Sequence, residues 1–143
     1  HREADGRWFG NDPELVTELR GEAAERLIPQ IRLAVQSYPY VKPGSYLAWP
    51  GPNSNSFVQH VLAETPQLAQ ALPPTAIGKD WRNDGLYAGL TPSRTGIQAS
   101  AYGLAGITLG WVEGVEINLL GLVAGFDLRQ PALKLPGWGR IGV

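Results

Sequence analysis

Cysteine and methionine are both absent from this chain of 143 residues. Without cysteine, the chain forms no disulfide, offers no thiolate to a metal and has no thiol nucleophile. Because a translation product begins with methionine, we expect His1 to follow a segment that was removed. The polar residues at the start do not form a signal peptide. The removed segment could have carried a signal or a membrane anchor, so membrane association through a lost anchor stays open.

Charged side chains are also scarce, at 17% of the residues against about 25% in a typical domain. The 12 basic residues nearly balance the 13 acidic ones, so nothing indicates a nucleic-acid partner. A surface with few charges favours contact with another part of the protein or another molecule. We expect the partner to be another protein or the missing upstream segment. No apolar run reaches the roughly 18 residues that a membrane-spanning helix needs.

Histidine occurs only twice, as His1 and His60. The two are far apart in the sequence, and no carboxylates stand near them at ligand spacing, so we expect no metal. The glycine-rich segments lack the Gly-Lys-Ser/Thr that completes a phosphate loop. We therefore expect no cofactor of any kind.

Helical patterns dominate the first half of the chain. Asp12-Pro13-Glu14 has the residues of a helix start. An apolar stripe at spacings of three and four then runs from Glu22 to Tyr38. Pro29 lies inside this stripe and is expected to kink or split the helix. We expect a short strand at 45–49, and a second helix from about Asn55 to Glu64 with a further helical turn after it.

The second half of the chain has the pattern of a sheet. The segment 75–95 is predicted to be mostly loop, packed across the core. Beyond it, apolar residues alternate with smaller or polar ones over 107–111, 115–119 and 122–128, and 133–135 is expected to add an edge strand. Helices first and an antiparallel sheet of four to six strands last predict one α+β domain over 1–143, incomplete at its N-terminus.

The most informative segment is Trp49-Pro50-Gly51-Pro52-Asn53-Ser54-Asn55-Ser56-Phe57-Val58. Proline and glycine end whatever precedes it. Asn and Ser are the residues that cap the free N–H groups of a helix, and apolar residues at helical spacing follow. Ser54 is therefore predicted at or just before a helix N-terminus, where a nucleophile or an anion is favoured.

The run from Asn53 to Val58 resembles the nucleophile motif of NlpC-type papain-like domains, in which Cys stands where this chain has Ser54. The resemblance implies a papain-like fold of the permuted type, with the second helix starting near Asn55 and packed on the late sheet. More closely, three segments resemble a family of uncharacterised bacterial domains, over about Trp8 to Gly142. The three segments that carry this resemblance are 49–58, Leu72-Pro73-Pro74-Thr75-Ala76-Ile77-Gly78-Lys79-Asp80 and Glu116-Ile117-Asn118-Leu119-Leu120-Gly121-Leu122. The resemblance implies a bacterial protein. It does not distinguish a cytoplasmic location from an envelope-associated one.

Ser54, flanked by Asn53 and Asn55, is the candidate catalytic residue, but serine needs a well-placed base. His60 lies roughly 240° around the helix from Ser54 and points away from it. His1 stands at the end of the chain, and a papain-like histidine would come from an upstream strand. A structural cap is the other interpretation of Ser54.

Four further polar residues are candidate binding residues: Lys79, Asp80, Glu116 and Asn118. Lys79 and Asp80 form either a surface ion pair or a polar group folded toward the loop that contains Asn53. Glu116 and Asn118 share one strand face. If the apolar residues beside them face the core, these two face solvent, or else they line a polar cleft near the helix start.

Two function classes follow. The first is a non-catalytic binding or structural module on a papain-like scaffold, with exposed aromatic residues at its partner surface. The second is a serine-dependent amidase, esterase or acyltransferase that acts on cell-envelope peptide or lipid. In the second, Ser54 attacks and the helix N–H groups hold the oxyanion.

Overall fold

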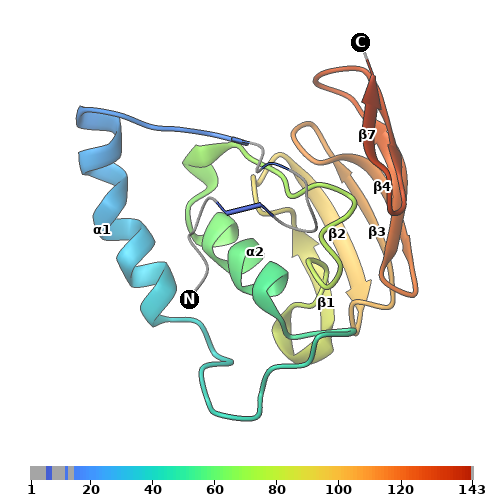
Figure 1. The fold of residues 1–143 in the computed structure, drawn as a ribbon, viewed down its shortest axis with the longest axis horizontal. Helices are drawn as coiled ribbons and strands as arrows, with labels where there is room; N and C mark the ends of the chain where they lie inside the picture. The colour runs from blue at the N-terminus through green and yellow to red at the C-terminus, as the bar shows by residue number, and fades with distance from the viewer. Residues whose placement is uncertain (1–5, 8–11, 13–14, 143) are drawn as a thin grey trace.

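The computed structural model describes residues 6–7, 12 and 15–142. Among these residues, two α-helices and two short 3-10 turns precede a seven-stranded sheet (Figure 1). The helices are α1 (Glu22–Gln36) and α2 (Ser54–Glu64), with 3-10 turns at Pro66–Leu68 and Asn83–Gly85. The strands are β1 (Leu86–Leu90), β2 (Gly96–Ala101), β3 (Ala105–Gly110), β4 (Gly114–Leu119), β5 (Leu122–Asp127), β6 (Ala132–Leu135) and β7 (Gly139–Gly142). The α+β class predicted from the sequence is confirmed.

Helix α1 begins later than the sequence predicts. The described residues from 15 to 20 are not helical, and Gly21 adopts φ 61° and ψ −144°, which breaks any helix that runs into it. Pro13 and Glu14 lie outside the described residues. The helix is not split at Pro29. Most of α1 is exposed, so water can hydrate the carbonyl that Pro29 leaves without a donor.

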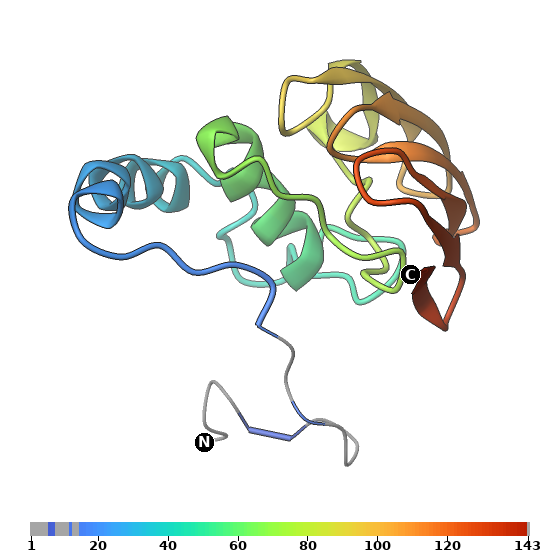
Figure 2. The ribbon, with the colours of Figure 1, turned by 90° about the horizontal axis from the view of Figure 1, so that it is seen from above.

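Three layers follow one another across the molecule. Seen from above, α2 lies between α1 and the sheet, and the loop after α2 runs between α2 and the strands (Figure 2). The buried apolar residues are few and mostly small: Leu27, Ala34, Leu62, Ala76, Val112, Val123 and Ala132. The core between the helices and the sheet is therefore filled largely by polar side chains.

The sheet is a meander in which each strand pairs antiparallel with the next, in the order β1 to β7. Seven strands exceed the predicted four to six, because β1 lies inside the segment predicted as loop and neither β2 nor β7 was predicted as a strand. The strand predicted at 45–49 is absent, since residues 45–47 have no regular secondary structure and residues 48–49 form a bend. Gly125 stands where an added Cβ would lie 2.1 Å from the Val115 carbonyl oxygen, so only glycine allows β4 and β5 to approach this closely.

The polarity of the sheet is the reverse of the predicted one. Val115, Ile117 and Leu119 were expected to face the core, but Ile117 is 53% exposed and Leu119 is 65% exposed. Glu116 and Asn118, expected by default on a solvated face, are buried at 2% and 4%. Alternation with period two distinguishes the two faces of a strand but does not say which face is covered.

Candidate functional site

Asn53 caps α2, and its neighbours complete the cap. Its side-chain Oδ1 accepts hydrogen bonds from the backbone N–H of Asn55 at 2.9 Å and of Ser56 at 3.2 Å. In return, the Ser56 Oγ accepts a hydrogen bond from the backbone N–H of Asn53 at 2.7 Å. This reciprocal arrangement is a capping box. The prediction that Ser54 lies at a helix N-terminus is confirmed, since α2 begins at Ser54.

The same two asparagines hold a distant loop against the helix start. Asn53 Nδ2 donates to the carbonyls of Ala48 and Ile77, both at 3.0 Å. Asn55 Nδ2 donates to the Ile77 carbonyl at 2.8 Å. Gly78 lies directly on Asn53, where an added Cβ would come within 2.3 Å of the Asn53 amide nitrogen. Asn53 and Asn55 therefore position the segment that leads into Lys79 and Asp80.

Ser54 stands apart from these contacts. Its side chain is exposed, and among the described residues no hydrogen bond to its hydroxyl occurs. His60 Nε2 lies 3.0 Å from the Ala34 carbonyl and 3.1 Å from Ser37 Oγ, at the end of α1. His1 lies outside the described residues. The described part of the chain thus brings no histidine to Ser54.

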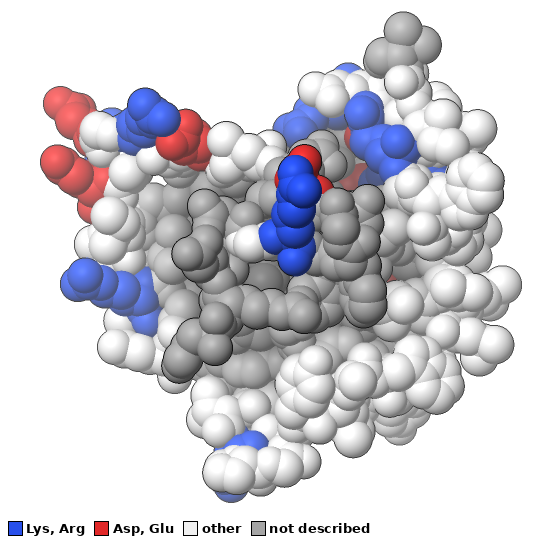
Figure 3. Space-filling model, viewed as in Figure 1, with Lys and Arg blue, Asp and Glu red and all other residues white. Residues whose placement is uncertain are grey.

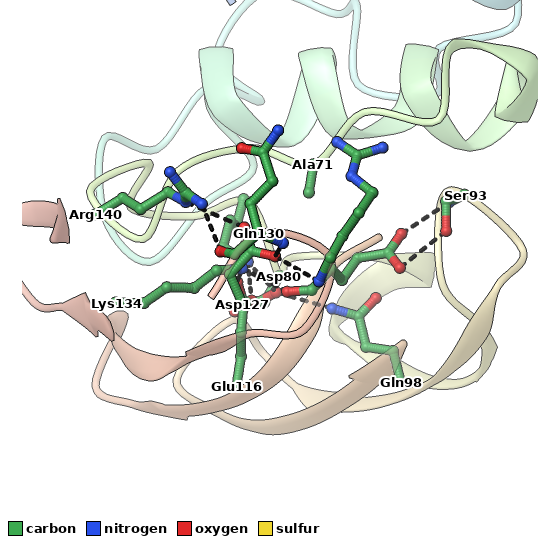
Figure 4. Close-up of polar contacts among 12 residues, drawn as sticks. Ala71, Asp80, Ser93, Gln98, Glu116, Asp127, Gln130, Lys134 and Arg140 are labelled. Atoms are coloured by element: carbon green, nitrogen blue, oxygen red, sulfur yellow. Dashed lines mark hydrogen bonds and ion pairs between the residues drawn. The ribbon is translucent and has the colours of Figure 1, made fainter. Parts of the chain in front are cut away.

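Lys79, Glu116 and Lys134 form a buried chain of ion pairs between the loop and the sheet. Glu116 and Lys134 are seen in Figure 4. Lys79 Nζ lies 2.5 Å from Glu116 Oε2, and Lys134 Nζ lies 2.6 Å from Glu116 Oε1. Lys134 also donates to the backbone carbonyl of Glu113. Each of these side chains is at most 5% exposed. One carboxylate therefore binds two ammonium groups that come from different elements.

Asp80 extends this cluster toward β2 and β4. Its Oδ1 accepts from Gln98 Nε2 at 2.8 Å, and its Oδ2 accepts from Asn118 Nδ2 at 2.6 Å. Lys79 Nζ lies 3.6 Å from Asp80 Oδ1. The amide oxygen of Asn118 in turn accepts the backbone N–H of Gly121 at 2.9 Å. All four predicted binding residues thus belong to one buried cluster, and Asn53 and Asn55 hold the loop that carries two of them.

The pKa values of Lys79 and Glu116 shift toward the charged forms. Burial alone lowers the pKa of Lys79, but the negative charges of Asp80 and Glu116 outweigh it and the pKa is raised. Burial alone raises the pKa of Glu116, but Lys79 and Lys134 outweigh it and the pKa is lowered. Both groups are therefore ionised at neutral pH, and their charges compensate each other.

Several members of the cluster were not predicted from the sequence: Ser93, Gln98, Glu113 and Lys134. Lys134 had a signal, because it is a lone cation between two leucines in a predicted strand. Glu113 was interpreted only as a turn residue, yet its carboxylate accepts from the Ser93 N–H at 2.9 Å and the Ser93 hydroxyl at 2.8 Å. These partners are 20 residues apart in the sequence, so only the fold brings them together.

The cluster is arranged to hold elements together. No group of three or more His, Cys, Asp or Glu side chains that could hold a metal occurs among the described residues. The carboxylate oxygens of Asp80 and Glu116 already accept hydrogen bonds from protein donors. Fully paired buried groups of this kind rigidify a fold and specify one arrangement of its core.

The opposite face of the sheet, here called the outer face, is apolar on every strand. Its large side chains, each at least 41% exposed, are Leu86, Leu90, Ile97, Ile107, Leu109, Ile117, Leu119, Leu122, Phe126, Leu133 and Ile141. The strand register places these residues on one side, and their neighbours there are alanine, valine, leucine or glycine. Within the described part of the chain, no helix lies on that side of the sheet (Figure 2). Figure 3 has the same view as Figure 1, and the lower right of the molecule, on the side where the strands lie, shows almost no charged side chains.

The fold and the site define a small α+β protein with a charged interior and an apolar sheet surface. The family model described as "Protein of unknown function (DUF3750)" matches residues 1–81. That match covers more than half of the chain, so the chain belongs to this family. It includes both helices and Lys79–Asp80 but ends before β1. No curated protein and no solved structure matches the chain. No helix among the described residues is long and apolar enough to cross a membrane.

Proposed function

We propose that this chain is a non-catalytic binding module on a papain-like scaffold, and that its outer face pairs with the outer face of a second copy. The helix that starts at Ser54 and the antiparallel sheet after it support the permuted scaffold. The single observation that carries the function is the outer face itself, which is apolar across all seven strands and exposed. An exposed apolar patch of this extent marks an interaction surface.

The size of the outer face suits a dimer. With about 3.4 Å per residue and about 4.8 Å between strands, the seven strands span roughly 600 Å² in projection. Two copies packed face to face would bury at least about 1,200 Å², above the roughly 1,000 Å² expected of a biological interface. Two sheets stacked about 10 Å apart form an ordinary β-sandwich core.

The chemistry of the outer face suits self-pairing in particular. A twofold interface places the same patch on both sides, so any charge at its centre would meet a like charge. The strand residues of the outer face carry none. A hollow of about 280 Å³ lies over small residues such as Ala88 and Ala99, while Phe126 projects from β5 and is 41% exposed. Hollows and projections on one apolar face allow two copies to interlock.

The test is the mass of the full chain in solution, measured by light scattering after size exclusion, for the parent and two matched variants. Ile117→Lys places a cation at the centre of the outer face, whereas Ile28→Lys makes the same change at an exposed isoleucine of α1. We expect a dimer for the parent and for Ile28→Lys. For Ile117→Lys we expect a dimer Kd raised at least about hundredfold, because two unpaired cations would be buried.

A monomeric parent at micromolar concentrations would contradict self-pairing, as would an Ile117→Lys variant as dimeric as the parent. Neutral lipid vesicles added to the parent provide a second arm. Vesicle binding by a monomer would assign the outer face to a membrane surface and overturn the proposal. Circular dichroism of both variants checks that they fold like the parent, which we expect because both positions are exposed.

The serine-dependent amidase, esterase or acyltransferase is the second proposal, and its nucleophile is Ser54. It needs a base that the described residues do not place beside Ser54. A serine-reactive fluorophosphonate probe tests it: an enzyme predicts labelling of the parent that Ser54→Ala loses. Equal labelling of the two proteins would eliminate Ser54 as a nucleophile.

A further inference from the structure

A second surface feature is independent of the outer face. A cleft of about 430 Å³ lies between the end of α1, the side of α2 and the segment that leads into β1. Its volume falls in the range of small-molecule sites, about 300–1,000 Å³. Its polar lining includes His60 and Glu64 from α2 and Arg82 and Asn83 from the opposite side.

Arg82 is the distinctive group of this cleft. Its Nη1 donates to the Leu90 carbonyl at 3.1 Å and to Gln98 Oε1 at 3.0 Å. The guanidinium carbon lies 3.8 Å from the centre of the Tyr87 ring. Burial lowers the pKa of Arg82, but an arginine keeps its charge at any physiological pH. Arg82 was not predicted from the sequence as a functional residue.

The half-buried charge of Arg82 has no carboxylate partner among the described residues, where the recorded ion pairs involve other cations. The nearby Asp80 carboxylate is committed to Gln98 and Asn118. Both donations of Arg82 to Leu90 and Gln98 come from Nη1, and its guanidinium also interacts with the Tyr87 side chain. Among the described residues, its Nε and Nη2 pair with no carboxylate. An arginine with this edge available binds carboxylates in a bidentate manner.

The walls of the cleft are aromatic. Tyr38, Tyr40, Trp81 and Tyr87 all line it, and Tyr38 packs edge-on against Tyr40 with ring centres 5.5 Å apart. Such walls favour a planar apolar body packed face-to-edge or offset. Glu64 also lines the cleft, but it is exposed at the end of α2, so water and salt screen its charge.

From this cleft we infer a binding site for a small aromatic carboxylate. The carboxylate pairs with Nε and Nη2 of Arg82, and the ring lies among Tyr38, Tyr40, Trp81 and Tyr87. The inference does not depend on the proposed dimer, because the cleft lies on the helix side of the sheet and the outer face lies on the other.

The experiment is an NMR titration of the full chain with benzoate, and with benzamide as the uncharged probe of the same shape. We expect millimolar or tighter binding of benzoate, as its few heavy atoms allow. Benzamide should bind at least about tenfold more weakly, because it lacks the charge that Arg82 recognises. The shifted resonances should include the Arg82 Nε–H and the amides of Ser37, Tyr38, Tyr40 and residues 81–87.

Arg82→Gln should weaken benzoate binding about tenfold or more, and Arg94→Gln, which changes an exposed arginine of the β1–β2 turn, should leave it unchanged. Because Arg82 also bonds to Leu90 and Gln98, its loss could disturb the fold. The comparison of benzoate with benzamide in the parent therefore decides independently. Equal affinity for the two probes, or shifts confined to residues away from the cleft, would overturn the inference.

Discussion

At the scale of the residue, the amide of Asn53 joins three parts of the backbone. Its oxygen caps α2, and its nitrogen binds the carbonyls of Ala48 and Ile77. Asn53 is 5% exposed, so water cannot replace these partners. The adjacent Ser54 is exposed and takes no part. Two neighbouring polar residues of the same motif thus have unequal structural roles.

This difference predicts unequal effects on stability. Asn53→Ala should lower the free energy of unfolding by about 1–3 kcal/mol, because it removes the cap and leaves the Ile77 carbonyl with one donor fewer. Ser54→Ala, the matched control one position away, should change it by less than about 0.5 kcal/mol. Urea unfolding followed by circular dichroism measures both. A Ser54→Ala loss as large as that of Asn53→Ala would place Ser54 in the cap and contradict the assignment.

At the scale of the element, Glu116 connects the loop after α2 with β4 and β6. Lys79 reaches it from the loop, and Lys134 reaches it from β6. A buried carboxylate with two ammonium partners is costly to remove, because both cations then lie in a dry interior with less compensation. The cluster therefore acts as the joint between the helical layer and the sheet.

Glu116→Gln should lower the free energy of unfolding by about 3–5 kcal/mol at neutral pH. Glu25→Gln, the same change on the exposed side of α1, should alter it by no more than about 0.5 kcal/mol. The two variants are compared with the parent by chemical unfolding over a range of pH.

The pH profile follows from the two pKa shifts. The pKa of Glu116 lies below its ordinary value of 4.5, so its contribution to stability is present above that value and is lost as the pH falls through the folded-state pKa. The pKa of Lys79 lies above 10.5, so its contribution is lost as the pH rises through its raised pKa. Glu116→Gln should flatten the acid limb of the parent profile. An acid limb of unchanged steepness would show that Glu116 does not carry it.

At the scale of the whole molecule, the sheet has one polar, buried face and one apolar, exposed face. In a β-sandwich, such an apolar face packs against a second sheet. Charged groups fill the side of the sheet that faces α2 (Figure 4), and aliphatic groups cover the side that faces away. A face of this size left in water would favour association. The dimer expected above follows from this polarity, whereas the cleft around Arg82 depends only on the helical side.

Much of the local structure was predictable from the sequence. The start of α2 was placed within one residue, because Asn, Ser and the apolar residues after them have strong local preferences. The strands around Ile107, Ile117 and Ala124 were predicted from their alternation. Strands β1 and β2 were missed because alanine, glycine and serine give them a weak alternation. Membership of a family of unknown function was also predicted from the sequence, and the match to residues 1–81 confirms that part of the prediction. The match covers fewer residues than the predicted range of about Trp8 to Gly142 and says nothing of a papain-like relationship.

The sequence by itself determined that these strands have one polar and one apolar face, and that a capped helix precedes them. Both properties depend on neighbouring residues, so they can be read from a short window. Only the tertiary structure decided which face is buried. That choice depends on Lys79 and Asp80, which lie about forty residues before their partners in β4 and compensate the charges that would otherwise keep the polar face in water.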